Sequence, residues 1–266
     1  MPRFAANLSM MFNEVPFLER FAAAAAAGFS GVEYLFPYDF PGEVVAEHTR
    51  KNKLETALFN LPPGNWAAGE RGTTCLPGRE EEFRAGVAKA IEYARHLHAV
   101  RVHAMAGIVP QGADPAAVRA TYVANLKYAA AELAKHDITL LIEAINTRDM
   151  PGFFLNTQAQ SYIFVEEVGA PNLKMQMDLY HMQIMEGDLE TKLRRYAAHC
   201  GHVQIAGVPK RNEPDTGEVA YSHLYDVLDE IGYRGWVGCE YRPAGVTVDG
   251  LGWLRAAQAR KAAGRG

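Results

Sequence analysis

The stretch Lys174-Met175-Gln176-Met177-Asp178-Leu179-Tyr180-His181 decides how the chain folds around it. Its first residues alternate polar and apolar side chains, which is the period of a half-buried β-strand. The strand then ends in an acid, Asp178, with His181 three residues further on, whereas strands usually end in Gly, Asn or Pro turn residues. An acid and a histidine at a strand end indicate a site rather than a simple turn.

Predicted strands alternate with predicted helices on both sides of this stretch. The strands span residues 4–9, 31–36, 54–61, 100–105, 138–142, 173–179, 202–206 and 236–241. The helices span residues 15–27, 43–52, 79–98, 115–136, 157–168, 189–199, 221–231 and 248–259. Such alternation implies a parallel sheet, and eight units in 266 residues favour a closed barrel over an open doubly wound sheet. We therefore predict an α/β fold, a single (β/α)8 TIM barrel domain over residues 1–266.

Composition and charge restrict the class of protein. Hydrophobic residues make up 48% of the chain and charged residues 22%, as in globular proteins with a substantial core. The formal net charge of −4 argues against nucleic acid or an anionic membrane as the main partner, and no apolar run is long enough to span a bilayer. Cys75, Cys200 and Cys239 form neither a zinc pattern nor a disulfide framework, which fits a reducing cytoplasm. We expect a cytoplasmic protein; its oligomeric state stays open.

Polar residues follow four successive strands of the second half. Glu143, Asp178, Gln204 and Glu240 lie at or near the ends of strands five to eight, about one strand–helix unit apart. In a (β/α)8 barrel the active site is built at the C-terminal ends of the strands, so these side chains should converge. A single acid at a strand end is more often a salt-bridge or capping residue than a ligand. Four polar residues at the ends of successive strands are less easily explained by chance. A divalent cation would relieve the repulsion between three buried acids, and oxygen ligands favour Mg²⁺ or Mn²⁺.

Several longer motifs of the chain resemble the hydroxypyruvate isomerase family of the xylose-isomerase-like barrels. They are Asn7-Leu8-Ser9-Met10, Asn60-Leu61-Pro62, Trp66-Ala67-Ala68-Gly69-Glu70-Arg71-Gly72, Pro77-Gly78-Arg79-Glu80, Ile142-Glu143-Ala144-Ile145-Asn146, Asp178-Leu179-Tyr180-His181-Met182-Gln183 and Gly238-Cys239-Glu240-Tyr241. The resemblance extends from residue 4 to about residue 253, and the Trp66 and Asp178 motifs are its most specific parts.

The resemblance implies an aldose-ketose type isomerase that interconverts hydroxypyruvate and 2-hydroxy-3-oxopropanoate (tartronate semialdehyde) through an enediol. It implies Glu143 and Glu240 as the acid/base pair, with Glu143, Asp178, Gln204 and Glu240 around a metal position. Related sugar epimerases have a histidine where this chain has Gln204, so metal binding should be weaker and the metal is not necessarily obligatory. Residues 143–155 are also similar to the 2-oxo-tetronate isomerases, whose four-carbon substrate is the alternative.

Four further residues are candidates for contacting the small 2-oxo acid substrate. His181 would hydrogen-bond a substrate oxygen, and Asn60, at the end of the third strand, is a second polar contact. The substrate carboxylate needs a cation, for which Arg71 on the long loop 62–78 and Lys210 after the seventh strand are candidates. Each of these residues has an ordinary structural explanation as well: a satisfied histidine, a turn residue or a solvated surface charge.

Other classes of protein share this type of barrel. A metal-dependent phosphodiesterase or endonuclease would need more metal ligands and a basic groove. The negative net charge of the chain and the glutamine at position 204 argue against this class. A non-catalytic sugar-acid-binding barrel would bind its ligand without exchanging the substrate α-proton. A sugar-phosphate enzyme would need a phosphate-binding loop, for which Gly207-Val208-Pro209-Lys210 is weak support.

Overall fold

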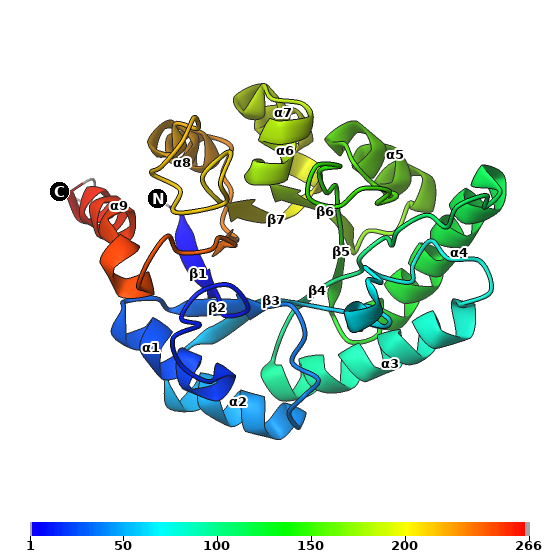
Figure 1. The fold of residues 1–266 in the computed structure, drawn as a ribbon, viewed down its shortest axis with the longest axis horizontal. Coiled ribbons are helices and arrows are strands. Elements are labelled where there is room, and N and C mark those ends of the chain that lie inside the picture. The colour runs from blue at the N-terminus through cyan, green and yellow to red at the C-terminus, as the bar shows by residue number, and fades with distance from the viewer. Residues whose placement is uncertain (1, 264–266) are drawn as a thin grey trace.

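The eight strands close into one parallel barrel in the computed structural model, which describes residues 2–263 (Figure 1). Each strand pairs with the next along the chain, and β8 pairs with β1 to close the ring. The strands are β1 (Arg3–Asn7), β2 (Gly31–Tyr34), β3 (Glu55–Asn60), β4 (Arg101–His103), β5 (Thr139–Glu143), β6 (Leu173–Asp178), β7 (Cys200–Ile205) and β8 (Trp236–Cys239). This confirms the predicted (β/α)8 barrel; residues 1 and 264–266 of the predicted domain lie outside the described residues.

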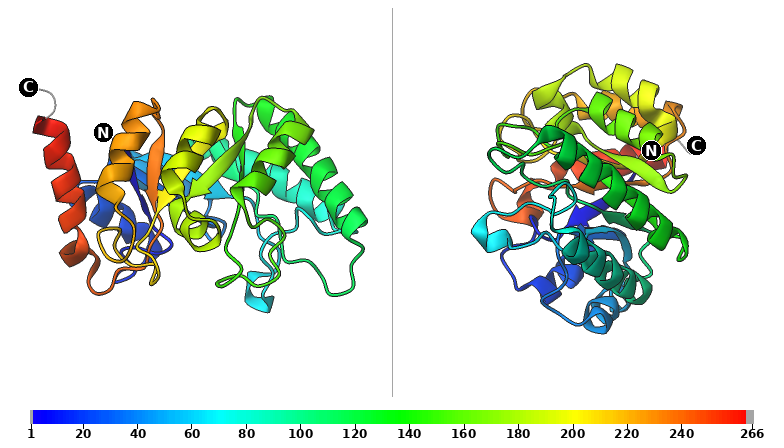
Figure 2. Two further views of the ribbon diagram at one scale, coloured as in Figure 1. Left: turned by 90° about the horizontal axis from the view of Figure 1, so that it is seen from above. Right: turned by 90° about the vertical axis from the view of Figure 1, so that its right-hand side faces the viewer.

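The helices surround the barrel and cover the outer faces of the strands (Figure 1). They are α1 (Arg20–Ala26), α2 (Gly42–Lys51), α3 (Glu80–Leu97), α4 (Pro115–Ala134), α5 (Gln158–Val168), α6 (Leu179–Met185), α7 (Leu189–Tyr196), α8 (Tyr221–Glu230) and α9 (Gly252–Ala263). Seen from the side, long loops gather at one end of the barrel, among them the cyan loop that contains Trp66–Ala68 (Figure 2). No helix among residues 2–263 is long and apolar enough to cross a membrane.

The sequence prediction was wrong in its count of helices and in several boundaries. The described residues contain nine α-helices rather than eight, because α6 follows β6 without a loop. The predicted helix 15–27 begins later, with a 3-10 turn at Phe17–Glu19 after Pro16, and the predicted helix 248–259 divides into a 3-10 turn and α9. Strand β4 ends at His103, two residues before the predicted end, so His103 is a strand-end residue.

Local sequence explains why the elements form where they do. In β5, Leu140, Leu141 and Ile142 are fully buried, as expected of a parallel strand covered on both faces. Helix α5 begins at a capping box in which the Thr157 side chain accepts from the Gln160 backbone, and the Gln160 side chain caps in return. Gly169 ends α5 with φ of 67°, a left-handed conformation that suits glycine. These local features determine where the strands and helices begin and end, and so where the strand ends lie.

Candidate active site

A cavity of about 770 Å³ opens at the C-terminal ends of the strands. Its wall contains polar and charged residues from most of the barrel, among them Asn7, Glu33, Asn60, Arg71, His103, Glu143, Asp149, Gln176, His181, Gln204, Arg211 and Glu240. The predicted convergence of strand-end residues is therefore present. Of the four, Glu143, Gln204 and Glu240 line the cavity directly, while Asp178 lies fully buried behind its wall.

Asp178 has two roles that follow from its place between β6 and α6. Its Oδ1 atom accepts from the backbone N–H of Tyr180 at 2.8 Å and so caps the N-terminus of α6. Its Oδ2 atom lies 3.5 Å from Nε2 of His181 and accepts a long hydrogen bond from Nη2 of Arg211 at 3.4 Å. The capping bond thus fixes the direction of the carboxylate, and burial raises its pKa to about 6 despite the opposing effect of Arg211.

His181 stands on the first turn of α6, where its ring is held by Asn146. Its Nδ1 atom lies 3.3 Å from the backbone N–H of Asn146, which can only donate, so Nδ1 is the acceptor. A neutral ring in this tautomer carries its proton on Nε2, which points toward Asp178. Burial, and then the charge of Arg211, lower the pKa of His181 well below its usual value. His181 therefore presents an N–H donor to the site.

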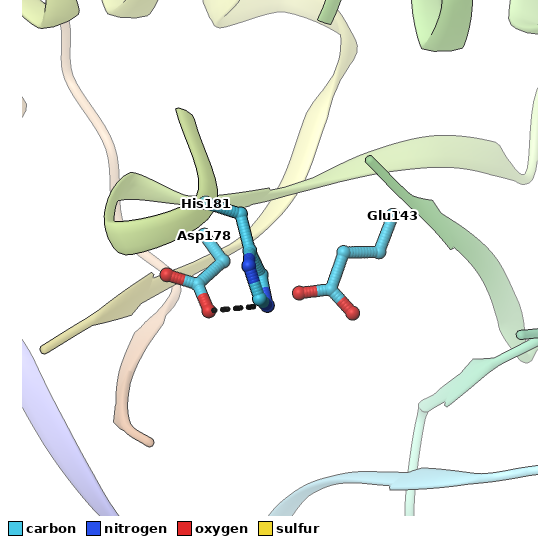
Figure 3. A group of neighbouring side chains, drawn as sticks. All are labelled: Glu143, Asp178 and His181. Carbon is cyan, nitrogen blue, oxygen red and sulfur yellow. Dashed lines mark ion pairs between the residues drawn. The ribbon is translucent and has the colours of Figure 1, made fainter. Parts of the chain in front are cut away.

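Asp178, His181 and Glu143 form a compact group. Among the described residues, their potential ligand atoms all lie within 4.8 Å of one another. Figure 3 shows the carboxyl groups of Asp178 and Glu143 pointing toward the His181 ring. A metal-ligating histidine normally donates its second ring N–H to an acceptor, whereas here the second nitrogen faces the N–H donor of Asn146. This arrangement suits His181 as a hydrogen-bond donor better than as a metal ligand.

Arg211 forms ion pairs with Asp178 and Glu240, and it was not among the site residues predicted from the sequence. Its Nη2 atom lies 3.2 Å from Glu240 Oε2, 3.4 Å from Asp178 Oδ2 and 3.3 Å from Nε2 of His181. The guanidinium also stacks on the Tyr180 ring, 4.9 Å from its centroid. The backbone of Arg211 is left-handed, with φ of 57°, which turns the buried side chain inward while the neighbouring Lys210 stays exposed.

Glu143 and Glu240 are buried carboxyls with strongly altered acidity. Burial is the main cause that raises the pKa of Glu143 well above its usual value, followed by repulsion from Glu240 and Asp178. Burial also raises the pKa of Glu240 to about 8, with Arg211 opposing the shift. The pKa of about 8 for Glu240 suits proton exchange near neutral pH, as a general acid or base requires.

Gln204 is held by hydrogen bonds at both ends of its amide. Its Nε2 atom donates to Glu33 Oε1 at 2.8 Å, and its Oε1 atom accepts from Gln176 Nε2 at 2.7 Å. Glu33 in turn accepts from Asn7 at 2.9 Å and contacts Nε2 of His202 at 2.7 Å. These bonds fix which atom of the amide is the oxygen, and one lone pair of that oxygen remains for a further partner.

Of the other predicted substrate contacts, Asn60 and Arg71 line the cavity and Lys210 does not. Asn60 ends β3 and lines the cavity, and Arg71 lines it from the loop 62–78. Arg71 stacks on the Trp66 ring at 3.9 Å and donates to the Glu70 carbonyl at 2.7 Å, so the loop holds it in place. Lys210 is exposed and is not among the residues that line the cavity. The cation after strand seven that faces the site is therefore Arg211.

The residues of the site fit a divalent cation. Three buried carboxyls, Glu143, Asp178 and Glu240, lie near one buried guanidinium, and their pKa values are raised, so a bound cation would stabilise their ionised forms. The Oε1 atom of Glu143 is buried and has no hydrogen-bond partner in the described part of the chain. Carboxylate and amide oxygens are the ligands that Mg²⁺ and Mn²⁺ prefer.

Comparisons with known proteins agree with this geometry. The sequence matches the family described as xylose isomerase-like TIM barrel over residues 21–257. It is 56% identical to the 2-oxo-tetronate isomerase of Cupriavidus necator over 96% of this chain and 98% of that protein. It is 52% identical to the hydroxypyruvate isomerase of Escherichia coli, again over 96% and 98%. A Brucella melitensis crystal structure described as an AP endonuclease, family 2, is 54% identical, with a TM-score of 0.95 over 96% of this chain and 99% of that one.

Proposed function

This chain belongs to the xylose isomerase-like TIM barrel family, and on that premise we propose that it isomerises a small 2-oxo acid. The reaction interconverts hydroxypyruvate and 2-hydroxy-3-oxopropanoate. The observation that carries the proposal is the pair of buried carboxyls, Glu143 and Glu240, on the wall of one cavity at the C-terminal end of the barrel. The isomerase names of two relatives more than 50% identical over nearly the full chain support the same reaction class.

The chemistry requires proton transfer at two neighbouring carbons. One glutamate removes a proton from C3 of hydroxypyruvate, and the electron pair of the broken C–H bond forms the C2–C3 double bond of the enediol. The other glutamate gives its proton to C2, while the hydroxyl proton on the C3 oxygen is transferred to the C2 oxygen. Glu143 and Glu240 come from β5 and from the residue after β8, so they are suited to act at different carbons. The two carboxyls end with exchanged protonation, which solvent restores.

Binding and orientation of the substrate fall to the remaining residues of the cavity. The Nε2–H of His181 would donate to a substrate oxygen, because Asn146 fixes its tautomer. Arg71, held over the cavity by Trp66, is the candidate for the substrate carboxylate, and Asn60 is a further polar contact. Arg211 would keep Asp178 and Glu240 in place and offers a second cation to the bound anion.

Glu143, Asp178, Gln204 and Glu240 would hold a divalent cation, which supplies Lewis-acid stabilisation of the enediolate oxygens when bound. Asp178 contributes only Oδ2, because Oδ1 caps α6. Gln204 contributes its oxygen, whose position is set by Gln176 and Glu33. Mg²⁺ and Mn²⁺ are the metals that this donor set favours.

A 2-oxo-tetronate, the four-carbon analogue, is the second candidate substrate. The 56% identity to a protein of that name supports it, and the cavity of about 770 Å³ has room for the additional carbon. One carbon unit changes binding by only about 1 to 3 kcal/mol, so the two acids should differ in rate rather than in kind.

The proposal is tested by incubating the purified protein with hydroxypyruvate and with 2-oxo-tetronates, in EDTA and in EDTA followed by excess Mn²⁺. We expect the aldehyde or isomeric ketone product to form from at least one acid, faster with Mn²⁺. Glu143→Gln and Glu240→Gln should each lower kcat by about 100-fold or more. Absence of product from both acids under all conditions would refute the proposed function, and an active Glu143→Gln variant would refute the two-glutamate scheme.

A further inference from the structure

The inner wall of the cavity contains a histidine that the mechanism above does not use. His103 is the last residue of β4 and is 1% exposed, yet it lines the cavity. Neither of its ring nitrogens has a hydrogen-bond partner among residues 2–263. A buried nitrogen without a hydrogen bond is unfavourable. Native proteins therefore retain such atoms mainly where a ligand, an ion or water provides the missing interaction.

Unpaired polar atoms lie on three neighbouring strands at this wall. Within the described residues, Glu143 Oε1 on β5 and Gln176 Oε1 on β6 are buried without hydrogen-bond partners, as are the nitrogens of His103 on β4. All three residues line the same cavity. Two of these groups are acceptors, and a neutral imidazole supplies one donor, so the wall matches a ligand with hydroxyl groups and a carbonyl oxygen. A hydroxy-ketone carries this combination.

His103 lies beside Glu143, one of the two proposed acid/base residues. Its Nδ1 atom lies 3.7 Å from Glu143 Oε2, too far for a good hydrogen bond but close enough for one substrate atom to lie against both groups. Its register partner on β3 is Asn60, another predicted substrate contact. His181 is held on α6 by Asn146, whereas His103 has no such partner.

We propose that His103 is a catalytic residue whose ring donates a hydrogen bond to the ketone oxygen of the substrate, where the enediolate charge develops. The inference rests on the proposed isomerase function and adds a residue to it. A donor held by the barrel wall needs no reorganisation during the reaction, and removing one such donor commonly lowers kcat by about 100- to 1000-fold. The effect should therefore fall mainly on kcat.

His103→Phe tests this assignment, because it removes both nitrogens and keeps an aromatic ring. We expect kcat for hydroxypyruvate, or for the 2-oxo-tetronate if that is the better substrate, to fall at least 30-fold. The thermal midpoint of the ligand-free protein should stay unchanged or rise, because the unpaired nitrogens are gone. A purely structural histidine would give the opposite pattern, a lower midpoint with kcat retained.

Two further variants keep the result interpretable. Tyr122→Phe removes another buried, unpartnered polar atom, which lies on α4 and outside the cavity wall, so its kcat should match that of the wild type. His103→Asn retains a donor and should keep more kcat than His103→Phe, and it replaces that variant if the latter does not fold. Kinetic constants of both His103 variants within threefold of wild type would overturn the inference alone. A wild-type protein that isomerises neither acid would refute the proposed function and this inference with it.

Discussion

Replacing Arg211 with methionine removes the buried cation that three carboxyls share. The guanidinium is 7% exposed and lies 3.2 Å from Glu240 and 3.4 Å from Asp178. Methionine preserves much of the side-chain volume and can still pack against Tyr180. The expected loss therefore comes from charge rather than from packing.

The size of the loss depends on pH. Breaking a buried ion pair from one side destabilises a protein by about 3 to 5 kcal/mol, unless the carboxyls left behind protonate. The pKa values of Asp178 and Glu240 are already raised to about 6 and about 8, and loss of the cation raises them further. At pH 5.5 these carboxyls are largely protonated in both proteins, so little is lost. The difference should grow by up to about 1.4 kcal/mol per pH unit for each carboxyl, beginning near pH 6 for Asp178 and near pH 8 for Glu240.

Urea unfolding followed by circular dichroism in EDTA, at pH 5.5 and pH 8.5, measures this difference. Arg234→Met is the matched control, because Arg234 is exposed and precedes β8 at the opposite end of the barrel. We expect Arg211→Met to lose about 3 to 5 kcal/mol at pH 8.5, and the control less than about 0.5 kcal/mol. Excess Mn²⁺ should return part of the loss. Equal stability of the two variants at pH 8.5 would refute the assigned role of Arg211.

Three other predictions follow from the same contacts. Mn²⁺ binding at pH 7 should release protons, because Glu143 and Glu240 have raised pKa values and carry protons that the metal must displace. Calorimetry in two buffers of different ionisation enthalpy measures this proton release. Equal heats of binding in the two buffers would contradict the prediction. Glu33→Gln should weaken Mn²⁺ affinity about 10- to 100-fold, because Glu33 no longer holds the amide of Gln204 in position. Titration of the substrate-free protein with Mn²⁺ measures the affinity. Unchanged affinity would exclude a role of Glu33 in positioning Gln204. Gly238→Ala should destabilise the protein by about 1 to 3 kcal/mol in chemical unfolding, since its Cβ would lie 2.1 Å from Glu33 Oε2; full stability would mean that Glu33 can move away.

The barrel was predictable because its signals are local and repeated eight times. Continuous apolar runs such as residues 138–142 indicate buried parallel strands, and the segments between them contain helix-forming residues with capping residues at their ends. The helix α6 was not predicted, because it has only seven residues and begins directly at the strand end. Its N-cap, Asp178, was interpreted only as a site residue, although it also caps the helix.

The site was predictable where strand ends determine it. Glu143, Asp178, Gln204 and Glu240 were predicted to lie close together because parallel strands bring their C-terminal ends together. Arg211 was missed because the sequence does not reveal which of two adjacent cations, Lys210 or Arg211, turns inward. Boundary errors can hide a strand-end residue as well, as the predicted strand 100–105 did by extending two residues beyond the observed end of β4.

The origin of the hydrogen delivered to C2 of the product tests the two-glutamate mechanism most directly. Hydroxypyruvate is converted in D₂O, and the product formed at early times is examined by proton NMR, with Glu143→Gln and Glu240→Gln alongside the wild type. Two separate carboxyls predict deuterium at C2 of the product, because the donor is not the group that removed the C3 proton. They also predict at least a 100-fold loss of rate in each variant. Substrate hydrogen retained at C2, together with near-wild-type conversion by either variant, would contradict the mechanism.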